Sequence, residues 1–140
     1  MAEAKQAMYR AKYPSIYHAT SKALWSGAVG AGKPYYPPTF EVDGGLTHAT
    51  AEASKLIPVL NHFYSSELGD WVCLVVSLAE LEKAGVDVVF EKATAVGTTE
   101  AVASDDLFPH IKGGIPASAV TDLLPIHRKE DGTFLSVAEK

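Results

Sequence analysis

The chain has 140 residues, of which 47% are apolar and 21% charged, and twelve basic against seventeen acidic side chains give a formal net charge of −5. This length corresponds to one domain, and the composition excludes intrinsic disorder as the main state. The acidic balance lacks the basic surface that nucleic acid requires, so nucleic acid is not expected as a partner. The longest apolar run, residues 71–79, is shorter than the roughly 20 residues that span a bilayer, so no membrane span is expected.

Cysteine usage indicates the compartment. The lone Cys73 lies inside the apolar run and cannot form an internal disulfide. Such a cysteine is typical of a reducing environment, so we expect a soluble, cytoplasmic protein. Its apolar neighbours predict that Cys73 is buried in a central strand and chemically inert.

The first half of the chain predicts two helices, two strands and a long loop. Residues 1–13 are good helix formers and stop at Pro14, and residues 15–19 favour a strand. Thr20 or Ser21 can cap a helix that continues through Trp25. Glycines and prolines are dense in residues 27–45, which predicts a loop, and residues 46–49 form a brief apolar strand.

The second half alternates irregularly between helices and strands. Residues 51–65 have helical apolar spacing, with Pro58 either in the first turn of a helix that starts near Leu56 or at a kink. Residues 71–78 predict a buried strand, 79–84 a short helix, 86–90 a strand, 92–106 a loop, and 118–126 the last strand. The charged residues from His127 onward are expected to be exposed to solvent. Without regular βαβ alternation, the fold class is α+β.

These elements suggest a simple domain organisation. Residues 1–14 form an N-terminal extension, residues 15–127 a single domain and residues 128–140 a charged C-terminal tail. There is no internal repeat and no linker.

A phosphate-binding loop motif is present by spacing alone. Residues 27–33 fit G-x-x-x-x-G-K, but Pro34 replaces the Ser or Thr that would hold magnesium. The preceding segment reads as helix rather than strand, and the following Tyr-Tyr-Pro-Pro cannot start a helix. We therefore interpret this segment as a flexible loop.

Three histidines lie at the ends of predicted elements, where scaffolds present functional side chains: His18, His48 and His110. His62 on a helix and His127 in the tail are expected at the surface. Any single histidine is more often structural than functional. The five histidines lack close helical ligand spacing, so nothing in the sequence requires a metal. Glu91, at the end of a strand, could orient a sugar hydroxyl or act as a general base, or it could be a charge turned to water.

Several short motifs occur in a specific order: I-Y-H-A-T at residues 16–20, G-L-T-H-A-T at 45–50, N-H-F-Y at 61–64, V-F-E at 89–91 and F-P-H-I-K-G at 108–113. Together they resemble the domain-of-unknown-function family 952 over residues 15–127. That family is similar in fold to the ADP-ribosyltransferases, whose split, strongly bent β-sheet with flanking helices holds NAD in a central cleft.

The resemblance implies which residues form the site. It implies that His18 holds the ribose of NAD and that His48 occupies a second polar position beside Thr50. It places His110 in a third motif and Glu91 at the end of a central strand. The residues implied for catalysis are His18, His48, Glu91 and His110, and those implied for cofactor binding are Thr20, Thr50 and Lys112.

This chain departs from the family pattern at Lys112, which replaces a tyrosine. A lysine cannot stack as a tyrosine does, but it adds charge near a phosphate. Strand alternation predicts that Lys112 lies beside His110, and we expect the three histidines to converge on one cleft with Glu91 at its rim.

Two functions remain open at this point. The first is binding of NAD or a related ADP-ribose ligand in that cleft, with glycohydrolase or transferase chemistry. The alternative is a catalytically degenerate structural or interaction subunit of a larger intracellular assembly.

Overall fold

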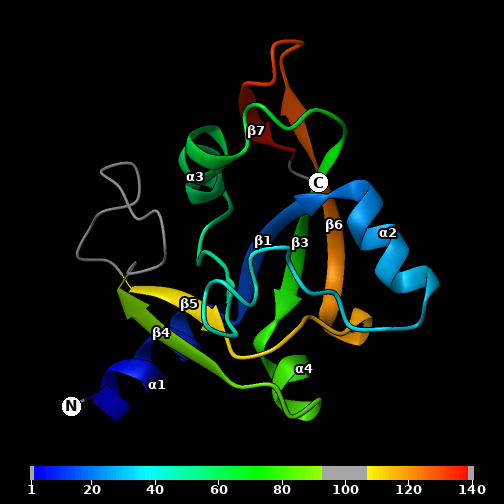
Figure 1. Cartoon of the computed structure of the whole chain (residues 1–140). Coiled ribbons are helices and arrows are strands. Elements are labelled where there is room, and N and C mark those ends of the chain that lie inside the picture. Colours follow the sequence, from blue (N-terminus) through cyan, green and yellow to red (C-terminus); the bar gives the residue numbers. More distant parts are fainter. Residues whose placement is uncertain (1, 93–106, 139–140) are drawn as a thin grey trace.

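The computed structural model describes residues 2–92 and 107–138. Helices and strands alternate irregularly along them (Figure 1). In chain order the elements are α1 (Ala2–Lys12), β1 (Ser15–Ser21), α2 (Lys22–Gly30), β2 (Thr47–His48), the 3-10 turn Ala53–Lys55, α3 (Leu56–Phe63), β3 (Trp71–Ser77), α4 (Leu78–Lys83), β4 (Val88–Lys92), β5 (Leu107–Ile111), the 3-10 turn Ala117–Ala119, β6 (Val120–Arg128) and β7 (Phe134–Val137). The predicted α+β class is confirmed. The loop predicted for residues 92–106 falls almost entirely outside the described residues.

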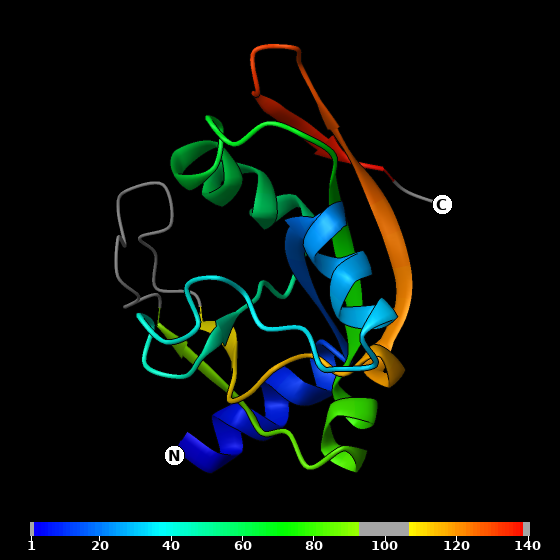
Figure 2. The ribbon, with the colours of Figure 1, turned by 45° about the vertical axis from the view of Figure 1, so that its right-hand side comes forward.

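Two antiparallel sheets form a strongly curled half-barrel. The first has the strand order β1-β3-β6-β7 and the second β2-β5-β4. Backbone hydrogen bonds of 2.8 Å in both directions between Tyr17 and Thr50 join them. In β1, His18 lies opposite Leu74 and Ala19 opposite Cys73 of β3. Beyond Tyr17 the two sheets separate, and β1 becomes the edge of the first sheet (Figure 2).

Local sequence signals set the element boundaries. Pro14 separates α1 from β1, and the Ser21 hydroxyl accepts a 3.1 Å hydrogen bond from the Leu24 N–H at the start of α2. Helix α3 begins at Leu56, which places Pro58 in its first turn and confirms that alternative over a kink. Gly27 and Gly30 lie within α2 rather than in a strand-to-helix turn, which excludes phosphate-binding-loop geometry there.

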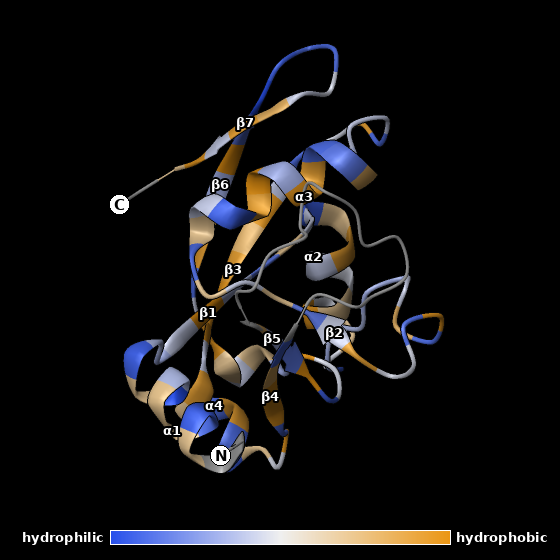
Figure 3. Ribbon diagram, turned by 90° about the vertical axis from the view of Figure 1, so that its left-hand side faces the viewer, coloured by the Kyte–Doolittle hydropathy of each residue, from blue (hydrophilic) through white to orange (hydrophobic). Residues whose placement is uncertain are grey.

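The core lies on both faces of β3, whose residues are almost all buried. One face packs Leu74 and Val76 against β1, β4 and β5. The other packs Trp71 and Cys73 against α3 and β7. Cys73 is fully buried, and burial raises the pKa of its thiol to about 12. In Figure 3, β3 is coloured hydrophobic and the turn between β6 and β7 hydrophilic.

The C-terminal segment corrects the expectation of a solvated tail. Strand β6 continues through His127 to Arg128, and residues 134–137 form β7 beside it. Phe134 is only 1% exposed and packs edge-on against Trp71, with ring centroids 5.5 Å apart. Burial of a side chain of this size stabilises the folded state by about 1.5–3 kcal/mol, which helps to dock the hairpin.

Side-chain carboxamides close two strand edges of the fold. At β4, the Gln6 side chain of α1 donates to the Phe90 carbonyl and accepts from the Phe90 N–H, both at 2.7 Å. At β7, the Asn61 side chain of α3 donates to the Phe134 carbonyl at 2.9 Å and accepts from the Phe134 N–H at 2.7 Å. Each side-chain amide thus makes the pair of hydrogen bonds that a neighbouring strand would make. No helix among the described residues is long and apolar enough to cross a membrane.

Candidate functional site

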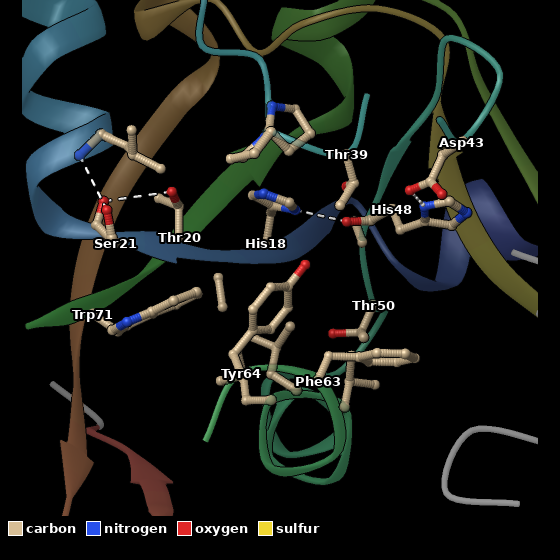
Figure 4. Close-up of a pocket in the computed structure, with 18 of the residues that line it drawn as sticks. His18, Thr20, Ser21, Thr39, Asp43, His48, Thr50, Phe63, Tyr64 and Trp71 are labelled. Carbon is tan, nitrogen blue, oxygen red and sulfur yellow. Dashed lines mark hydrogen bonds and ion pairs between the residues drawn. The ribbon is translucent and has the colours of Figure 1, made fainter. Parts of the chain in front are cut away.

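A cavity of about 570 Å³ opens where the two sheets separate. A cavity of this size is suited to a small organic molecule. It lies between β1, the segment 35–50, α3 and the start of β3. In Figure 4, polar side chains of β1 and the 39–48 segment lie opposite the aromatic side chains of α3 and β3. Its lining includes His18, Ala19, Thr20, Ser21, Tyr35, Asp43, His48, Thr50, Phe63, Tyr64, Glu67, Leu68, Trp71, Phe108 and His110.

His18 presents a hydrogen-bond acceptor to this cavity. Its Nδ1 lies 2.6 Å from the His48 carbonyl oxygen, which can only accept, so Nδ1 carries the proton. Burial lowers the pKa of His18 to about 4. The neutral ring therefore has an unprotonated Nε2, and this buried atom has no hydrogen-bond partner among the described residues.

His48 and His110 form a cross-strand pair on β2 and β5. Their ring centroids are 4.7 Å apart with the rings nearly perpendicular. Nδ1 of His48 lies 3.1 Å from the Asp43 carboxylate, and Nδ1 of His110 lies 2.9 Å from the Glu91 carboxylate. Burial, followed by the neighbouring His110, lowers the pKa of His48. His110 is 2% exposed, and its Nε2 likewise has no partner within the described part of the chain.

The two threonines implied for cofactor binding use their hydroxyl protons inside the protein. Thr20 donates to the Tyr35 hydroxyl at 2.7 Å, and Thr50 donates to the Glu52 carbonyl at 2.8 Å. Burial raises the pKa of Tyr35 to about 12. Both threonines line the cavity, and the hydroxyl protons that they donate within the protein are not free to bind a ligand.

Lys112 lies outside the lining of the cavity. Strand β5 ends at Ile111, the Lys112 N–H donates to the Asp87 carbonyl, and the Lys112 side chain is exposed. Lys112 was predicted to lie beside His110 because alternate residues of a strand share a face. The strand ends at Ile111, so this alternation does not extend to Lys112. The described lining residues include no lysine or arginine. Lys55 lies nearby, with Nζ 5.6 Å from the ring centre of Phe108 and 3.4 Å from the Glu52 carboxylate.

Sequence reasoning missed the aromatic wall of the cavity. Tyr64 and Trp71 have ring centroids 5.1 Å apart, and Phe63 lies 6.2 Å from Tyr64. The Trp71 indole N–H is buried and has no acceptor among the described residues. The apolar spacing of residues 51–65 predicts a helix with an apolar face but does not show that this face lines a cavity, although the motif N-H-F-Y at residues 61–64 marks this segment. No three His, Cys, Asp or Glu side chains of the described residues are placed to hold a metal.

The described residues form an α+β half-barrel domain with a cavity at the point where its two sheets separate. A family model described as "Protein of unknown function (DUF952)" matches residues 19–123, and the chain belongs to this family. No curated protein matches the chain.

Two solved structures have a similar fold. Protein CC0527 from Caulobacter crescentus is 19% identical, with a TM-score of 0.65 over 86% of this chain and 93% of that chain. A double mutant of the same protein is 20% identical, with a TM-score of 0.64 and the same coverage.

Proposed function

We propose that this domain has an ADP-ribosyltransferase-like fold and that its cavity binds NAD or a related ligand through a carboxamide-bearing ring. The observation that carries the proposal is the free edge of β1 at Ala19, beside the unprotonated Nε2 of His18. The carboxamide pairs with the backbone groups of Ala19, and a ligand hydroxyl donates a hydrogen bond to the Nε2 of His18.

Strand alternation defines the free edge. The N–H and C=O of Tyr17 bond to Thr50, so they point away from β3. Backbone groups two residues further along an antiparallel strand point to the same side. Ala19 therefore directs its N–H and C=O toward the cavity that it lines. Among the described residues, no backbone group pairs with Ala19 across this edge.

The protein itself illustrates how a carboxamide fits such an edge. Gln6 at Phe90 and Asn61 at Phe134 each satisfy one backbone N–H and one C=O with a single side-chain amide. A ligand carboxamide has the same donor and acceptor in the same plane. It would complete the edge at Ala19 in the same way, since a buried backbone group needs a partner.

The histidines supply acceptors for the rest of the ligand. Above pH 4 the Nε2 atom of His18 is unprotonated, and its lone pair accepts a hydrogen bond from a ribose hydroxyl. In hydrolysis or transfer, the glycosidic C–N bond between the ribose and the cationic pyridinium ring breaks, and the ring leaves with the bonding electron pair as neutral nicotinamide. Water or a hydroxyl forms the new C–O bond to the ribose. The Nε2 of His110, oriented by Glu91 at Nδ1, takes the proton that this oxygen loses. In this reaction Glu91 is a positioning residue.

The negative charge of the cavity lining favours binding of NAD through its nicotinamide ring rather than through its diphosphate. The charged carboxylates in the lining are Asp43 and Glu67, which disfavour an anion. We therefore expect a diphosphate to lie away from these carboxylates, toward Lys55, which is next to the lining residue Phe108. We expect NAD and free nicotinamide to bind and ADP-ribose to bind more weakly.

Calorimetric titration of NAD, nicotinamide and ADP-ribose tests the proposal. His18→Asn keeps a donor for the His48 carbonyl but removes the Nε2 acceptor, so NAD should bind about three- to tenfold more weakly. The matched control His127→Asn, on the exposed part of β6, should leave the affinity unchanged. Absence of binding by all three ligands to folded protein would contradict the proposal and favour an interaction module.

A further inference from the structure

We propose that the aromatic side of the same cavity binds an organic cation, an ammonium or guanidinium group carried on an apolar stem. This inference rests on the proposed function only in that the cavity binds a small molecule. The residues that carry it are Phe63, Tyr64 and Trp71 with Glu67 and Leu68.

The aromatic wall is fixed from behind. Trp71 packs between Tyr64 at 5.1 Å and Phe134 at 5.5 Å, measured between ring centroids. Phe134 is held on α3 by the two hydrogen bonds of the Asn61 amide. The faces of these rings are thus preorganised, and aromatic faces attract cations because their π-systems carry negative charge.

The rim of the wall is apolar and open to solvent. Leu68 is 72% exposed, and Phe63, Leu24 and Val42 are also exposed, although all four line the cavity. Exposed apolar side chains that converge on one concave site indicate a surface that a ligand covers. This rim suits the stem of an amphipathic ligand.

The charge of the rim favours a cation. Asp43 is already paired with His48, whereas the exposed Glu67 is in no ion pair among the described residues. The Glu67 N–H donates to the Tyr64 carbonyl at 2.9 Å, so the carboxylate follows directly after the ring. Burial first and then the Glu67 charge raise the pKa of Tyr64, consistent with this proximity.

The cations already near the wall do not occupy the cavity. Arg128 lies over the ring of Phe134 at 4.0 Å and donates to the carbonyls of Ser65, Gly69 and Gly132. Phe134 and Arg128 do not line the cavity. Arg128 thus shows that this aromatic cluster accepts a guanidinium on its far side, while the cavity side faces Glu67.

A set of three probes tests the sign of the preference. Benzyltrimethylammonium, benzyl alcohol and phenylacetate share a benzyl group and differ in charge. We expect the ammonium to bind, the alcohol to bind about five- to thirtyfold more weakly, since a desolvated cation–π contact contributes about 1–2 kcal/mol, and phenylacetate not to bind. Phenylacetate binding as tightly as the ammonium would overturn the inference.

Variants of the wall separate the ring from the charge. Tyr64→Leu should weaken ammonium binding severalfold while Tyr64→Phe retains it, and Glu67→Gln should remove most of its salt dependence. Glu130→Gln, an exposed carboxylate in the β6–β7 turn, is the matched control and should change nothing. Unaltered binding in both Tyr64→Leu and Glu67→Gln would overturn the inference. Glu67 is exposed, so its variant tests the proposal even if Tyr64→Leu does not fold.

The two proposals fail separately. Nicotinamide binding without ammonium binding would leave the proposed function intact and overturn this inference. Ammonium binding without nicotinamide binding would support the cation site and contradict the carboxamide site. Binding of neither would contradict both.

Discussion

The edges of β4 and β1 differ in how their backbone groups are satisfied. At β4 the Gln6 side chain pairs with both backbone groups of Phe90, and Arg10 adds a hydrogen bond to the Val88 carbonyl. At β1 the pairing with the second sheet ends at Tyr17, and the edge at Ala19 faces the cavity. The same backbone geometry is paired with a side-chain amide in one place and, among the described residues, has no backbone partner in the other, where we propose that a ligand binds.

The difference distinguishes polar groups that the fold satisfies from polar groups that have no partner among the described residues. Gln6 and Asn61 stabilise the fold because each closes an edge that would otherwise lose its hydrogen bonds to water on burial. Around Ala19, the buried Nε2 atoms of His18 and His110 and the indole N–H of Trp71 are left without partners in the described part of the chain. Groups left without partners are the ones that a ligand can satisfy.

We call the edge of β1 at Ala19 the open edge. The largest expected effect is a loss of stability in acid, caused by protonation of His18 beside this edge. The pKa of His18 falls from 6.5 in the unfolded chain to about 4 in the fold, so the unfolded state binds the proton first. The contribution of His18 is complete above pH 6.5 and is lost as the pH falls toward 4, about 3 kcal/mol in total. Chemical denaturation between pH 7 and pH 4 measures it.

His18→Asn serves as the control for this pH dependence. Asn does not titrate, so the variant should show a clearly flatter dependence of the free energy of unfolding on pH. The lowered pKa of His48 leaves a remaining slope in the same direction. An identical slope in parent and variant would show that His18 is not the group responsible.

The second effect concerns the closed edge at β7. Asn61→Leu removes both hydrogen bonds to Phe134 and leaves a buried N–H and C=O without partners. We expect the free energy of unfolding to fall by about 2–3 kcal/mol. Ser136→Ala, an exposed change on the same strand, should cost less than about 0.5 kcal/mol. A loss no larger than that of the control would show that Asn61 does not hold the hairpin.

The third effect is the corresponding change at β4. Gln6→Leu breaks the two hydrogen bonds to Phe90 near the N-terminal end of α1. Because Gln6 lies in the first turns of the N-terminal helix, where the chain end can fray and admit water, we expect a loss of about 1–2 kcal/mol. Thermal unfolding beside the exposed Lys5→Ala control checks this value. A larger loss than in Asn61→Leu would reverse the ranking of the two closed edges.

The smallest effect on stability is expected at the open edge. Ala19→Pro removes an N–H that the strand pairing does not use, so it should cost less than Asn61→Leu or Gln6→Leu. It should nevertheless abolish nicotinamide binding, because the donor is gone and the proline ring occupies its place. Unfolding and binding measured on the same sample separate the two consequences. Severe destabilisation would indicate that the Ala19 N–H has a partner within the fold.

The sequence predicted the elements whose signals are local. Proline and glycine positions, the Ser21 cap and the apolar run of β3 predicted the helices and most strands with errors of a few residues at their ends, but strands β5 and β7 were not predicted. The three histidines could be selected because each lies at an element end, and the structure places all three on one cavity. Their functional roles and those of Glu91, Thr20, Thr50 and Lys112 remain predictions.

The parts that sequence reasoning missed depend on tertiary contacts. Phe134 is one apolar residue in a charged segment, and only its contact with Trp71 shows why β7 forms. Gln6 and Asn61 look like ordinary surface amides until the strand edges are placed beside them. The apolar face of α3 has the same spacing whether it meets a core or a cavity, so the aromatic wall had no distinct signal.

Nuclear magnetic resonance of the backbone amides tests the central claim most directly. In ligand-free protein the Ala19 N–H should exchange with solvent faster than the N–H groups of Phe90 and Phe134, which side-chain amides protect. Added nicotinamide should shift and protect Ala19 while leaving Phe90 and Phe134 unchanged. The account would be contradicted if Ala19 were already as protected as Phe90, or if nicotinamide shifted other amides and left Ala19 unaffected.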